Sequence, residues 1–348
     1  MLPNEKVENY INEINVTLKP SDAYFATVLD LFAGSGGLAL GFEANGFRTI
    51  GFEKEIDYCL TYKNNLKADC LQIQLAKETK FPTASIIIGG PPCQPFSVGG
   101  KQKGLKDSRD GFPAFIAAVK QVKPELFLFE NVRGMMYRNK WYLDEIVTKL
   151  SLLGYIVDYK LFNTVNYGIP QKRKRVIVVG HKGGFEFPKP QKRQITSGEA
   201  LGELVEQIPP NAKFLTKNMD DYVARYEKAS KCIRPRDLRL NEPSRTLTCR
   251  NLAGATGDMM RIRLQDGRRR RLTVREAARL QSFPDWFKFF GSETSQFNQI
   301  GNAVPPLFSY HLAASVKQYM LASDKHKSAA QIEILNMSKI PPKQLSLF

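Results

Sequence analysis

The fold is decided by the stretch Val28-Leu-Asp-Leu-Phe-Ala-Gly-Ser-Gly-Gly37, in which a short apolar run leads into a glycine-rich turn. Residues 28–32 have the composition of a buried strand, and residues 38–45 continue as a helical pattern. The glycines allow a tight turn and a close approach of the backbone to a ligand at the start of the helix. Such a turn fits a dinucleotide site, an adenosyl cofactor or a tight loop without a ligand.

The same alternation of strand and helix continues through the first two-thirds of the chain. Short apolar runs with little polar alternation predict further buried strands at residues 49–52, 85–88, 126–129 and 176–179. Helical patterns lie between them at residues 112–122 and 141–153. This order predicts an α/β fold with a doubly wound, mostly parallel sheet, whose ligands bind at the carboxyl ends of the strands.

The pattern changes after Gly180, where residues 181–298 become rich in proline, glycine and arginine. Strands in this region are short, and we expect a second, smaller domain that is irregular and β-rich. Between Lys231 and Arg275 there are 13 basic and 4 acidic residues, which is about half of the excess positive charge of the chain.

The whole chain of 348 residues is strongly basic, with 51 Lys and Arg against 34 Asp and Glu and a net charge of +17. This excess favours a polyanionic partner, first nucleic acid and second an acidic membrane surface. The hydrophobic fraction of 43% excludes wholesale disorder. No apolar run approaches the roughly 18 residues of a membrane span. Five scattered cysteines and three distant histidines favour a reducing cytoplasm, with neither disulfides nor a bound metal.

Two of the predicted strands end in residues suited to chemistry. Glu53 follows the strand at 49–52, where an acid can accept hydrogen bonds from ribose hydroxyls, although a solvated acid is the plain alternative. The strand at 85–88 leads into Gly89-Gly-Pro-Pro-Cys-Gln-Pro-Phe-Ser97, where prolines fix the backbone before Cys93. A lone cysteine is usually a small core residue. At the carboxyl end of a strand beside the cofactor turn, it is a candidate nucleophile.

Two more motifs lie at the ends of predicted strands. Glu130-Asn-Val132 offers a proton donor or an acid that caps a helix. Gln171-Lys-Arg-Lys-Arg175 precedes the strand at 176–179, and strand alternation would send Arg173 and Arg175 to the same face, unless the run is only a basic surface. The glycine- and lysine-rich loop at 98–110 is suited to closing over phosphates.

The order of these motifs resembles the cytosine-5 DNA methyltransferase family of bacterial restriction–modification type. The resemblance includes Arg271-Leu-Thr-Val-Arg-Glu-Ala-Ala-Arg-Leu-Gln-Ser-Phe-Pro284 and Gly301-Asn-Ala-Val-Pro-Pro306, and it extends from about residue 28 to 316. It implies the fold of S-adenosylmethionine-dependent methyltransferases. We therefore expect an N-terminal extension (1–27), a catalytic and cofactor-binding domain (28–184 with 299–322), a target-recognition domain (185–298) and a flexible C-terminal tail (323–348).

The resemblance implies a reaction in which a thiolate activates cytosine. Cytosine C5 is too weak a nucleophile to attack a methyl sulfonium directly, whereas a thiolate added to C6 raises the electron density at C5. The resemblance assigns this nucleophile to Cys93. It also implies that Glu130 hydrogen-bonds the exocyclic amine and N3, and that Arg173 and Arg175 orient the base. The cytosine is expected to be flipped out of the duplex.

The resemblance also implies S-adenosylmethionine as the cofactor and no metal. Phe32 would pack on the adenine, Glu53 would bind the ribose and Asp69 would bind the adenine amine. The full set of expected cofactor contacts is Phe32, Gly34, Gly36, Gly37, Glu53, Asp69, Pro92 and Asn302. Two departures from the family pattern are Lys54 in place of an apolar residue and Asp69 in an Ala-Asp-Cys setting, and both predict a more open adenine pocket.

The expected partner is duplex DNA, read by a monomer. Arginine pairs with guanine and asparagine with adenine in the major groove, although many such residues contact only phosphate. The candidate DNA contacts are Ser97, Lys101, Lys103, Arg109, Arg245, Arg250 and Asn251.

Other functions remain open at this level. A cytosine-5 methyltransferase of tRNA would use the same chemistry, and a catalytically silent DNA-binding protein would use none of it. The C-terminal Gln344-Leu-Ser-Leu-Phe348 resembles the pentapeptide with which bacterial proteins bind the replication sliding clamp, although a frayed end is the plain alternative. The expected location is the bacterial cytoplasm, in association with the nucleoid. The sequence does not assign the recognised DNA sequence or a partner nuclease.

Overall fold

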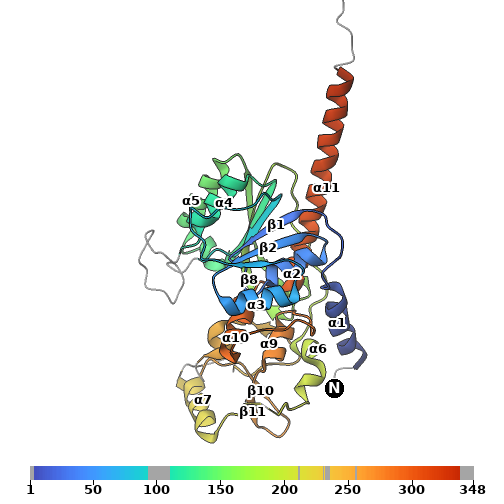
Figure 1. Ribbon diagram of the computed structural model, residues 1–348. Helices are drawn as coiled ribbons and strands as arrows, with labels where there is room; N and C mark the ends of the chain where they lie inside the picture. Colours follow the sequence, from blue (N-terminus) through green and yellow to red (C-terminus); the bar gives the residue numbers. More distant parts are fainter. Residues whose placement is uncertain are drawn as a thin grey trace, which may run out of the picture.

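The structure of the chain is a computed structural model that describes residues 4–92, 110–210, 212–229, 231, 236–254 and 257–337, with side chains from residue 10 to 323. A seven-stranded sheet forms its centre, with the strand order β3-β2-β1-β4-β5-β8-β6 (Figure 1). The strands are β1 (Thr27–Leu31), β2 (Arg48–Glu53), β3 (Cys70–Gln72), β4 (Ile86–Gly89), β5 (Leu126–Val132), β6 (Ile156–Asn163) and β8 (Lys174–His181).

The sheet is mostly parallel, as predicted. Strands β3, β2, β1, β4 and β5 pair in parallel, whereas β8 runs antiparallel to both of its neighbours, β5 and β6. The expectation of an α/β fold with a mostly parallel, doubly wound sheet is confirmed. Residues of β4 are buried on both faces, which explains why its sequence reads as an unbroken apolar run.

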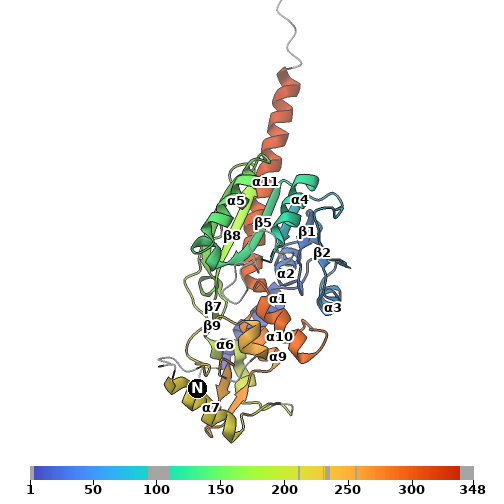
Figure 2. The same ribbon diagram turned by 90° about the vertical axis from the view of Figure 1, so that its left-hand side faces the viewer.

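Helices cover both faces of this sheet (Figures 1 and 2). On one face α4 (Phe112–Val122) and α5 (Lys140–Ser151) pack against side chains such as Leu29, Ile87 and Phe127. On the other, α2 (Gly37–Ala44) and α11 (Pro306–Met337) pack against their neighbours in sequence, such as Val28, Ile88 and Leu128. The alternation of side chains along each strand thus divides the apolar residues between two cores. Helix α3 (Ile56–Asn65) lies beside β2 and β3.

Three features of this part differ from the sequence expectation. Strand β6 was not predicted because it lies at the sheet edge and alternates partly covered with exposed residues, so it has no apolar run. Strand β3 was also not predicted, because it is only three residues long. Helix α11 continues to Met337, past residue 322 where a tail was expected, because neither proline nor glycine occurs between residues 307 and 337.

Residues 185–298, called the recognition region below, form the lower part of the molecule in Figure 1. Helices make up most of the regular structure in its described part, which corrects the expectation of a β-rich domain. They are α6 (Ser197–Leu201), α7 (Lys217–Ala229), α8 (Cys249–Ala253), α9 (Val274–Leu280) and the start of α10 (Glu293–Asn302). Short strands form two small sheets, one of β10 (Arg261–Arg263) with β11 (Arg269–Arg271) and one of β7 (Gln171–Lys172) with β9 (Ser244–Arg245). Three 3₁₀ segments complete the described elements, at Arg133–Met136, Thr164–Tyr167 and Gly202–Val205.

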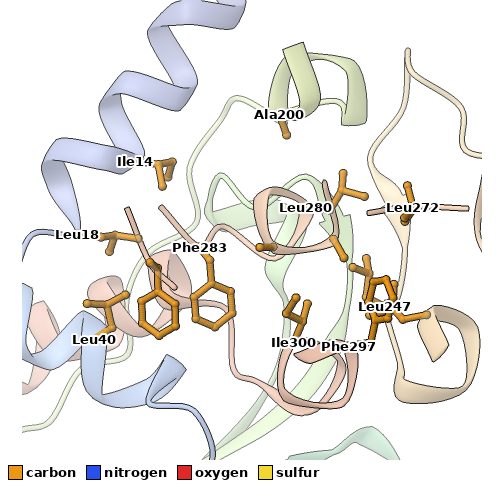
Figure 3. Close-up of a cluster of buried hydrophobic side chains, with 14 of the residues drawn as sticks. Ile14, Leu18, Leu40, Ala200, Leu247, Leu272, Leu280, Phe283, Phe297 and Ile300 are labelled. Atoms are coloured by element: carbon orange, nitrogen blue, oxygen red, sulfur yellow. The ribbon is translucent and has the colours of Figure 1, made fainter. Parts of the chain in front are cut away.

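A shared apolar cluster joins the two parts. In Figure 3, Leu40 of α2 lies near Leu18 and Phe283, while Leu280 and Ile300 continue the cluster into the recognition region. The first helix, α1 (Asn4–Thr17), contributes Ile14 to the same cluster.

Helix α1 also forms polar contacts with both parts of the chain. The Tyr10 hydroxyl donates to the Gly168 carbonyl at 3.1 Å, and the Asn15 carbonyl accepts from the Trp286 indole at 3.0 Å. The N-terminal extension is therefore packed against the body of the protein. Among the described residues, no helix is long and apolar enough to cross a membrane.

Candidate active site

A cleft of about 800 Å³ lies along the carboxyl-terminal edge of the main sheet. Its walls are the segments that follow β1, β2, β3, β4 and β5, together with the start of α8 and the end of α10. The strand order reverses beside β1, whose neighbours β2 and β4 lead to opposite edges of the sheet. This is the place where open α/β sheets bind their ligands.

The glycine-rich turn after β1 presents backbone to the cleft. Gly34 has a left-handed φ of 56°, and a Cβ built on it would meet no atom within 4 Å. Gly36 and Gly37 serve packing: an added Cβ would lie 2.3 Å from Leu66 in the first case and 2.6 Å from the Val304 carbonyl oxygen in the second. Gly34 and Gly37 line the cleft, whereas Gly36, which was also expected to contact the cofactor, does not.

Phe32 lines the cleft from a backbone conformation that non-glycine residues rarely adopt. Its φ is 58°, and such a conformation persists only where the surrounding structure enforces it. The Gly111 N–H donates to the Pro92 carbonyl at 3.0 Å, and the Phe32 ring lies against Gly111. Phe32 and Pro92 therefore form one apolar wall of the cleft, as the resemblance implies.

Glu53, at the end of β2, is fixed by backbone donors. Its Oε2 accepts from the Gly34 N–H at 2.9 Å, and its Oε1 accepts from the N–H groups of Lys54 at 2.8 Å and Glu55 at 3.0 Å. The side chain lines the cleft. Because each carboxylate oxygen can accept more than one hydrogen bond, this acid retains capacity for ligand hydroxyls.

Buried polar atoms in the cleft have no hydrogen-bond partner among the described residues. They include both carboxylate oxygens of Asp30, in β1, and the hydroxyl of Ser35. Burial, and secondarily the nearby Glu53, raise the pKa of Asp30 well above its ordinary value. Buried polar groups are normally hydrogen-bonded, so unpaired ones in a cleft fit a ligand that supplies the missing partners. The hydroxyl and ammonium groups of S-adenosylmethionine meet this requirement.

Sequence reasoning did not name Asp30 as a site residue, although its signal is present. An acid inside the apolar strand Val28-Leu-Asp-Leu31 is unusual, because a buried carboxylate costs free energy unless it has a role.

Asp69 does not lie in the cleft. Its side chain is 82% exposed and forms an ion pair with Lys63 at 3.5 Å. Strand β3 begins at the next residue and runs parallel to β2, so Asp69 lies at the amino edge of the sheet, opposite the cleft. Residues 73–75, which follow β3, line the cleft instead, and Gln74 is the polar residue among them.

Glu130 and Arg175 form an ion pair in the cleft. Arg175 Nε lies 2.8 Å from Glu130 Oε1, and the two side chains are 14% and 11% exposed. The atoms are not aligned for a hydrogen bond. The antiparallel register places Arg175 opposite Val132, two residues from Glu130 on the same face. Arg175 Nη1 donates to the Lys174 carbonyl at 2.9 Å.

Arg173 lies in the same cleft as Arg175, as strand alternation predicts, although the strand is interrupted between β7 and β8 at this residue. Its side chain is buried. Its Nη1 donates to the carbonyls of Leu247 at 2.9 Å and Gly301 at 3.3 Å. Burial, and then the neighbouring Arg175, lower the pKa of Arg173 to about 9. Both arginines line the cleft, but Arg173 ties the recognition region to α10.

The end of α10 completes the cleft with Asn302, another expected cofactor contact. Its Oδ1 accepts from the Cys249 thiol at 3.0 Å. Burial raises the pKa of that thiol, so it is held in its neutral form.

The candidate DNA contacts of the recognition region are not equivalent. Asn251 is buried, and its Oδ1 and Nδ2 are bonded to the Thr248 N–H and the Thr246 carbonyl, so it caps α8. Both terminal nitrogens of Arg245 contact Asp258, one through its carboxylate and one through its carbonyl. The fold itself uses the polar atoms of both side chains, and a contact of either with DNA stays a prediction.

Five expected site residues lie outside the described residues: Cys93, Ser97, Lys101, Lys103 and Arg109. Pro92, which is bonded to Cys93, and Asp110, which is bonded to Arg109, both line the cleft. Within the part of the chain that the structure describes, no group of His, Cys, Asp or Glu is arranged to hold a metal ion.

Comparisons with known proteins place the chain among methyltransferases. Type II methyltransferase M.AplI of Arthrospira platensis is 57% identical over 293 residues, which cover 83% of this chain and 85% of that protein. Type II methyltransferase M1.HphI of Haemophilus parahaemolyticus is 34% identical over 321 residues, covering 83% and 86%.

Solved structures share the fold. The Entamoeba histolytica methyltransferase EhMeth matches with a TM-score of 0.66 and 17% identity, over 84% of this chain and 98% of that one. The S. pombe Dnmt2 methyltransferase matches with a TM-score of 0.65 and 18% identity, over 85% and 99%. The family described as C-5 cytosine-specific DNA methylase matches residues 26–318. The chain belongs to this family and is a DNA cytosine-5 methyltransferase.

Proposed function

We propose that this enzyme methylates C5 of cytosine within a specific sequence of duplex DNA and so protects that sequence from a cognate restriction endonuclease. The protective role is supported by the relatives, which are named Type II methyltransferases. The observation that carries the chemistry is the covered Glu130–Arg175 pair, which lines the same cleft as Pro92, the residue bonded to Cys93.

In this proposal Cys93 is the nucleophile. Its thiolate forms a bond to cytosine C6, the electron pair of the C5–C6 double bond moves to C5, and N3 takes up a proton. Sulfur suits this step because a thiolate attacks well near neutral pH and also leaves readily. After methylation, the C5 proton is lost to solvent, the C5–C6 double bond forms again as the sulfur–C6 bond breaks, and Cys93 leaves as the thiolate. N3 returns its proton to Glu130.

Glu130 binds the base and exchanges a proton with N3. A carboxyl group there accepts a hydrogen bond from the exocyclic amine and shares the N3 proton as the thiolate adds. Arg175 orients Glu130 through the 2.8 Å ion pair. Arg173 acts indirectly. Its bonds to the carbonyls of Leu247 and Gly301 connect the recognition region to α10 beside the cleft.

The cofactor of this family is S-adenosylmethionine, which when bound supplies an electrophilic methyl group on sulfur. Glu53, already fixed by three backbone N–H groups, is suited to the ribose hydroxyls. Asp30 and Ser35 are suited to its remaining polar groups, and Phe32 and Pro92 to its apolar surface.

The target cytosine must leave the base stack to reach this cleft, at a cost of a few kcal/mol. We propose that residues 28–184 and 299–322 form the catalytic part of the enzyme. The recognition region selects the DNA sequence around the target cytosine. The enzyme would then act on the chromosome, in the nucleoid of a bacterial cell.

The test is methyl incorporation by the whole enzyme into duplex DNA and into tRNA. The expected result is transfer to duplex DNA at cytosine C5, read by bisulfite sequencing, with no transfer by C93A. C93A should still bind the duplex. Methylation by C93A would contradict the mechanism, and transfer to tRNA alone would contradict the substrate.

We also propose that Gln344-Leu-Ser-Leu-Phe348 binds the replication sliding clamp. This segment lies outside the described residues. A chain ending at Lys343 should lose affinity for the clamp and keep its methyltransferase activity. Equal clamp affinity of the two chains would contradict this proposal.

A further inference from the structure

Three arginines of the recognition region converge on the carboxylate of Asp258. Arg236 Nε and Arg245 Nη1 each lie 3.3 Å from Asp258 Oδ1, and Arg250 Nε lies 3.4 Å from Oδ2. The Asp258 carbonyl accepts a further hydrogen bond from Arg245 Nη2 at 2.6 Å. Three positive charges therefore surround one negative charge, and the group as a whole is positive.

The main chain that carries Asp258 is held in place. The next residue, Met259, is buried, and the N–H of Met260 donates to the Asn251 carbonyl at 2.9 Å. Asn251 belongs to α8, the helix that also carries Arg250. The packed main chain thus fixes the position of the carboxylate relative to the helix from which Arg250 projects.

The three arginines differ in what they still offer to a partner. The side chains of Arg236 and Arg245 are 25% and 35% exposed, and both terminal nitrogens of Arg245 are already bonded. The Arg250 side chain is 76% exposed, and its ion pair with Asp258 is formed through Nε. Its two terminal amino groups therefore remain as a planar fork. Arg250 follows Cys249 in the sequence, and Cys249 lines the cleft.

We infer that Asp258 positions Arg250 to read a guanine in the recognised DNA sequence. The inference rests on the proposed function as a methyltransferase of duplex DNA. An arginine that pairs with guanine O6 and N7 uses both terminal nitrogens and requires its plane to be fixed. The Asp258 carboxylate forms an ion pair with Arg250 Nε at 3.4 Å and leaves those two nitrogens available for this contact.

A phosphate contact fits the cluster less well. An arginine fork can bind phosphate as well as guanine, but a phosphate contact depends mainly on the charge of the side chain. A carboxylate 3.4 Å from Arg250 Nε offsets part of that charge, although the cluster as a whole stays positive. The guanine edge is uncharged, so the same carboxylate fixes the fork without opposing the contact. Asp258 is then a positioning residue, and Arg250 is the residue that reads the base.

The experiment compares wild type with R250A, R250K, D258N and D258E. The recognised sequence is first read by bisulfite sequencing, and kcat/KM is then measured on the cognate duplex and on duplexes with each base pair replaced. D266N is the matched control, because Asp266 accepts from Arg268 Nε at 2.7 Å in the same region, at an exposed turn. Unfolding midpoints of all variants identify any loss of folded protein.

The expected result is a loss of about ten- to a hundredfold in discrimination at one G·C pair, the same pair for R250A, R250K and D258N. R250K should lose it because lysine keeps the charge but lacks the fork. For cognate DNA, the variants should raise KM and leave kcat unchanged. D258E should keep part of the discrimination that D258N loses, and D266N should match wild type.

Two results would overturn the inference. If R250A weakens all duplexes equally and lowers the slope of log affinity against log salt by about one, Arg250 contacts a phosphate. If R250A relaxes discrimination while D258N does not, Asp258 has no positioning role. Absence of sequence-specific methylation by wild type would instead refute the proposed function, so the two failures are distinguishable.

Discussion

The cleft and the recognition region use charged residues in opposite ways. In the cleft, Asp30 keeps both carboxylate oxygens unpaired at full burial. In the recognition region, Arg270 is equally buried but its guanidinium forms two bonds with Glu276, at 2.6 and 2.8 Å. The cleft leaves polar atoms for a ligand, whereas the recognition region uses them to hold its own fold.

This difference changes what the high basic charge means. The stretch from Lys231 to Arg275 reads as a DNA-binding surface by composition. In the structure, Arg261 is buried between Glu227 and Asp237, and Arg275 donates to two main-chain carbonyls. Arginines such as these therefore stabilise a region that has few strands. The positive charge that faces DNA is a smaller part of the total than composition indicates.

The largest expected effect is on the catalytic pair. E130Q should lower kcat by about 10²–10⁴-fold, because the amide cannot share the N3 proton and no longer pairs ionically with Arg175. Single-turnover methylation with saturating DNA and cofactor measures this. E145Q, which removes an exposed acid paired with Lys149, is the control and should keep full activity. A fall of less than about tenfold would remove Glu130 from the proton-handling role.

The next effect is on stability in the recognition region. R270A should lower the free energy of unfolding by about 3–5 kcal/mol, because it leaves the Glu276 carboxylate buried without its partner. Chemical unfolding followed by circular dichroism measures this change. R239A breaks an exposed ion pair with Glu242 and should have little effect. Equal unfolding midpoints for the two variants would contradict the structural role of the buried arginines.

D30N should have opposite effects on binding and stability. Without cofactor, it should stabilise the protein at pH 8, because the amide is neutral at every pH and needs no proton to be buried. Because the pKa of Asp30 is raised in the folded state, the folded protein holds a proton that the unfolded chain releases. The free energy of unfolding of wild type therefore falls as the pH rises above the ordinary pKa of an aspartate. D30N removes this dependence. It should also weaken S-adenosylmethionine about ten- to a hundredfold, by loss of a charge-assisted contact.

Calorimetric titration and thermal unfolding from pH 5 to pH 9 measure both quantities for D30N and wild type. A variant that binds the cofactor as tightly as wild type would show that the unpaired carboxylate serves no ligand.

The smallest effect is expected at Asp69. D69N should leave KM for S-adenosylmethionine within about twofold of wild type, because it disrupts only an exposed ion pair with Lys63 at the far edge of the sheet. Initial rates at varied cofactor concentration measure this. A tenfold rise in KM would restore Asp69 to the adenine site and contradict the placement of β3.

Strands β1, β2, β4 and β5, which lead into the cleft, could be predicted because each is an apolar run followed by glycine, proline or an acid. The three-residue strand β3 has no such run, so the position of Asp69 before it could not be predicted. Strand alternation predicts that Arg173 and Arg175 share a face, and both line the cleft although the strand is interrupted at Arg173. The cap formed by Asn251 was readable from Thr248-Cys-Arg-Asn251, whereas the pairing of Arg261 with Glu227, 34 residues away, was not.

The central claim, that Cys93 adds to cytosine, is tested most directly by trapping the adduct. A duplex with 5-fluorocytosine at the target position allows addition and methylation, but fluorine cannot leave as a cation, so the bond to sulfur persists. Mass spectrometry of the digested complex should show one methylated nucleotide bonded to the peptide that contains Cys93. Absence of an adduct during methyl transfer to normal DNA, or an adduct at Cys249, would contradict the account.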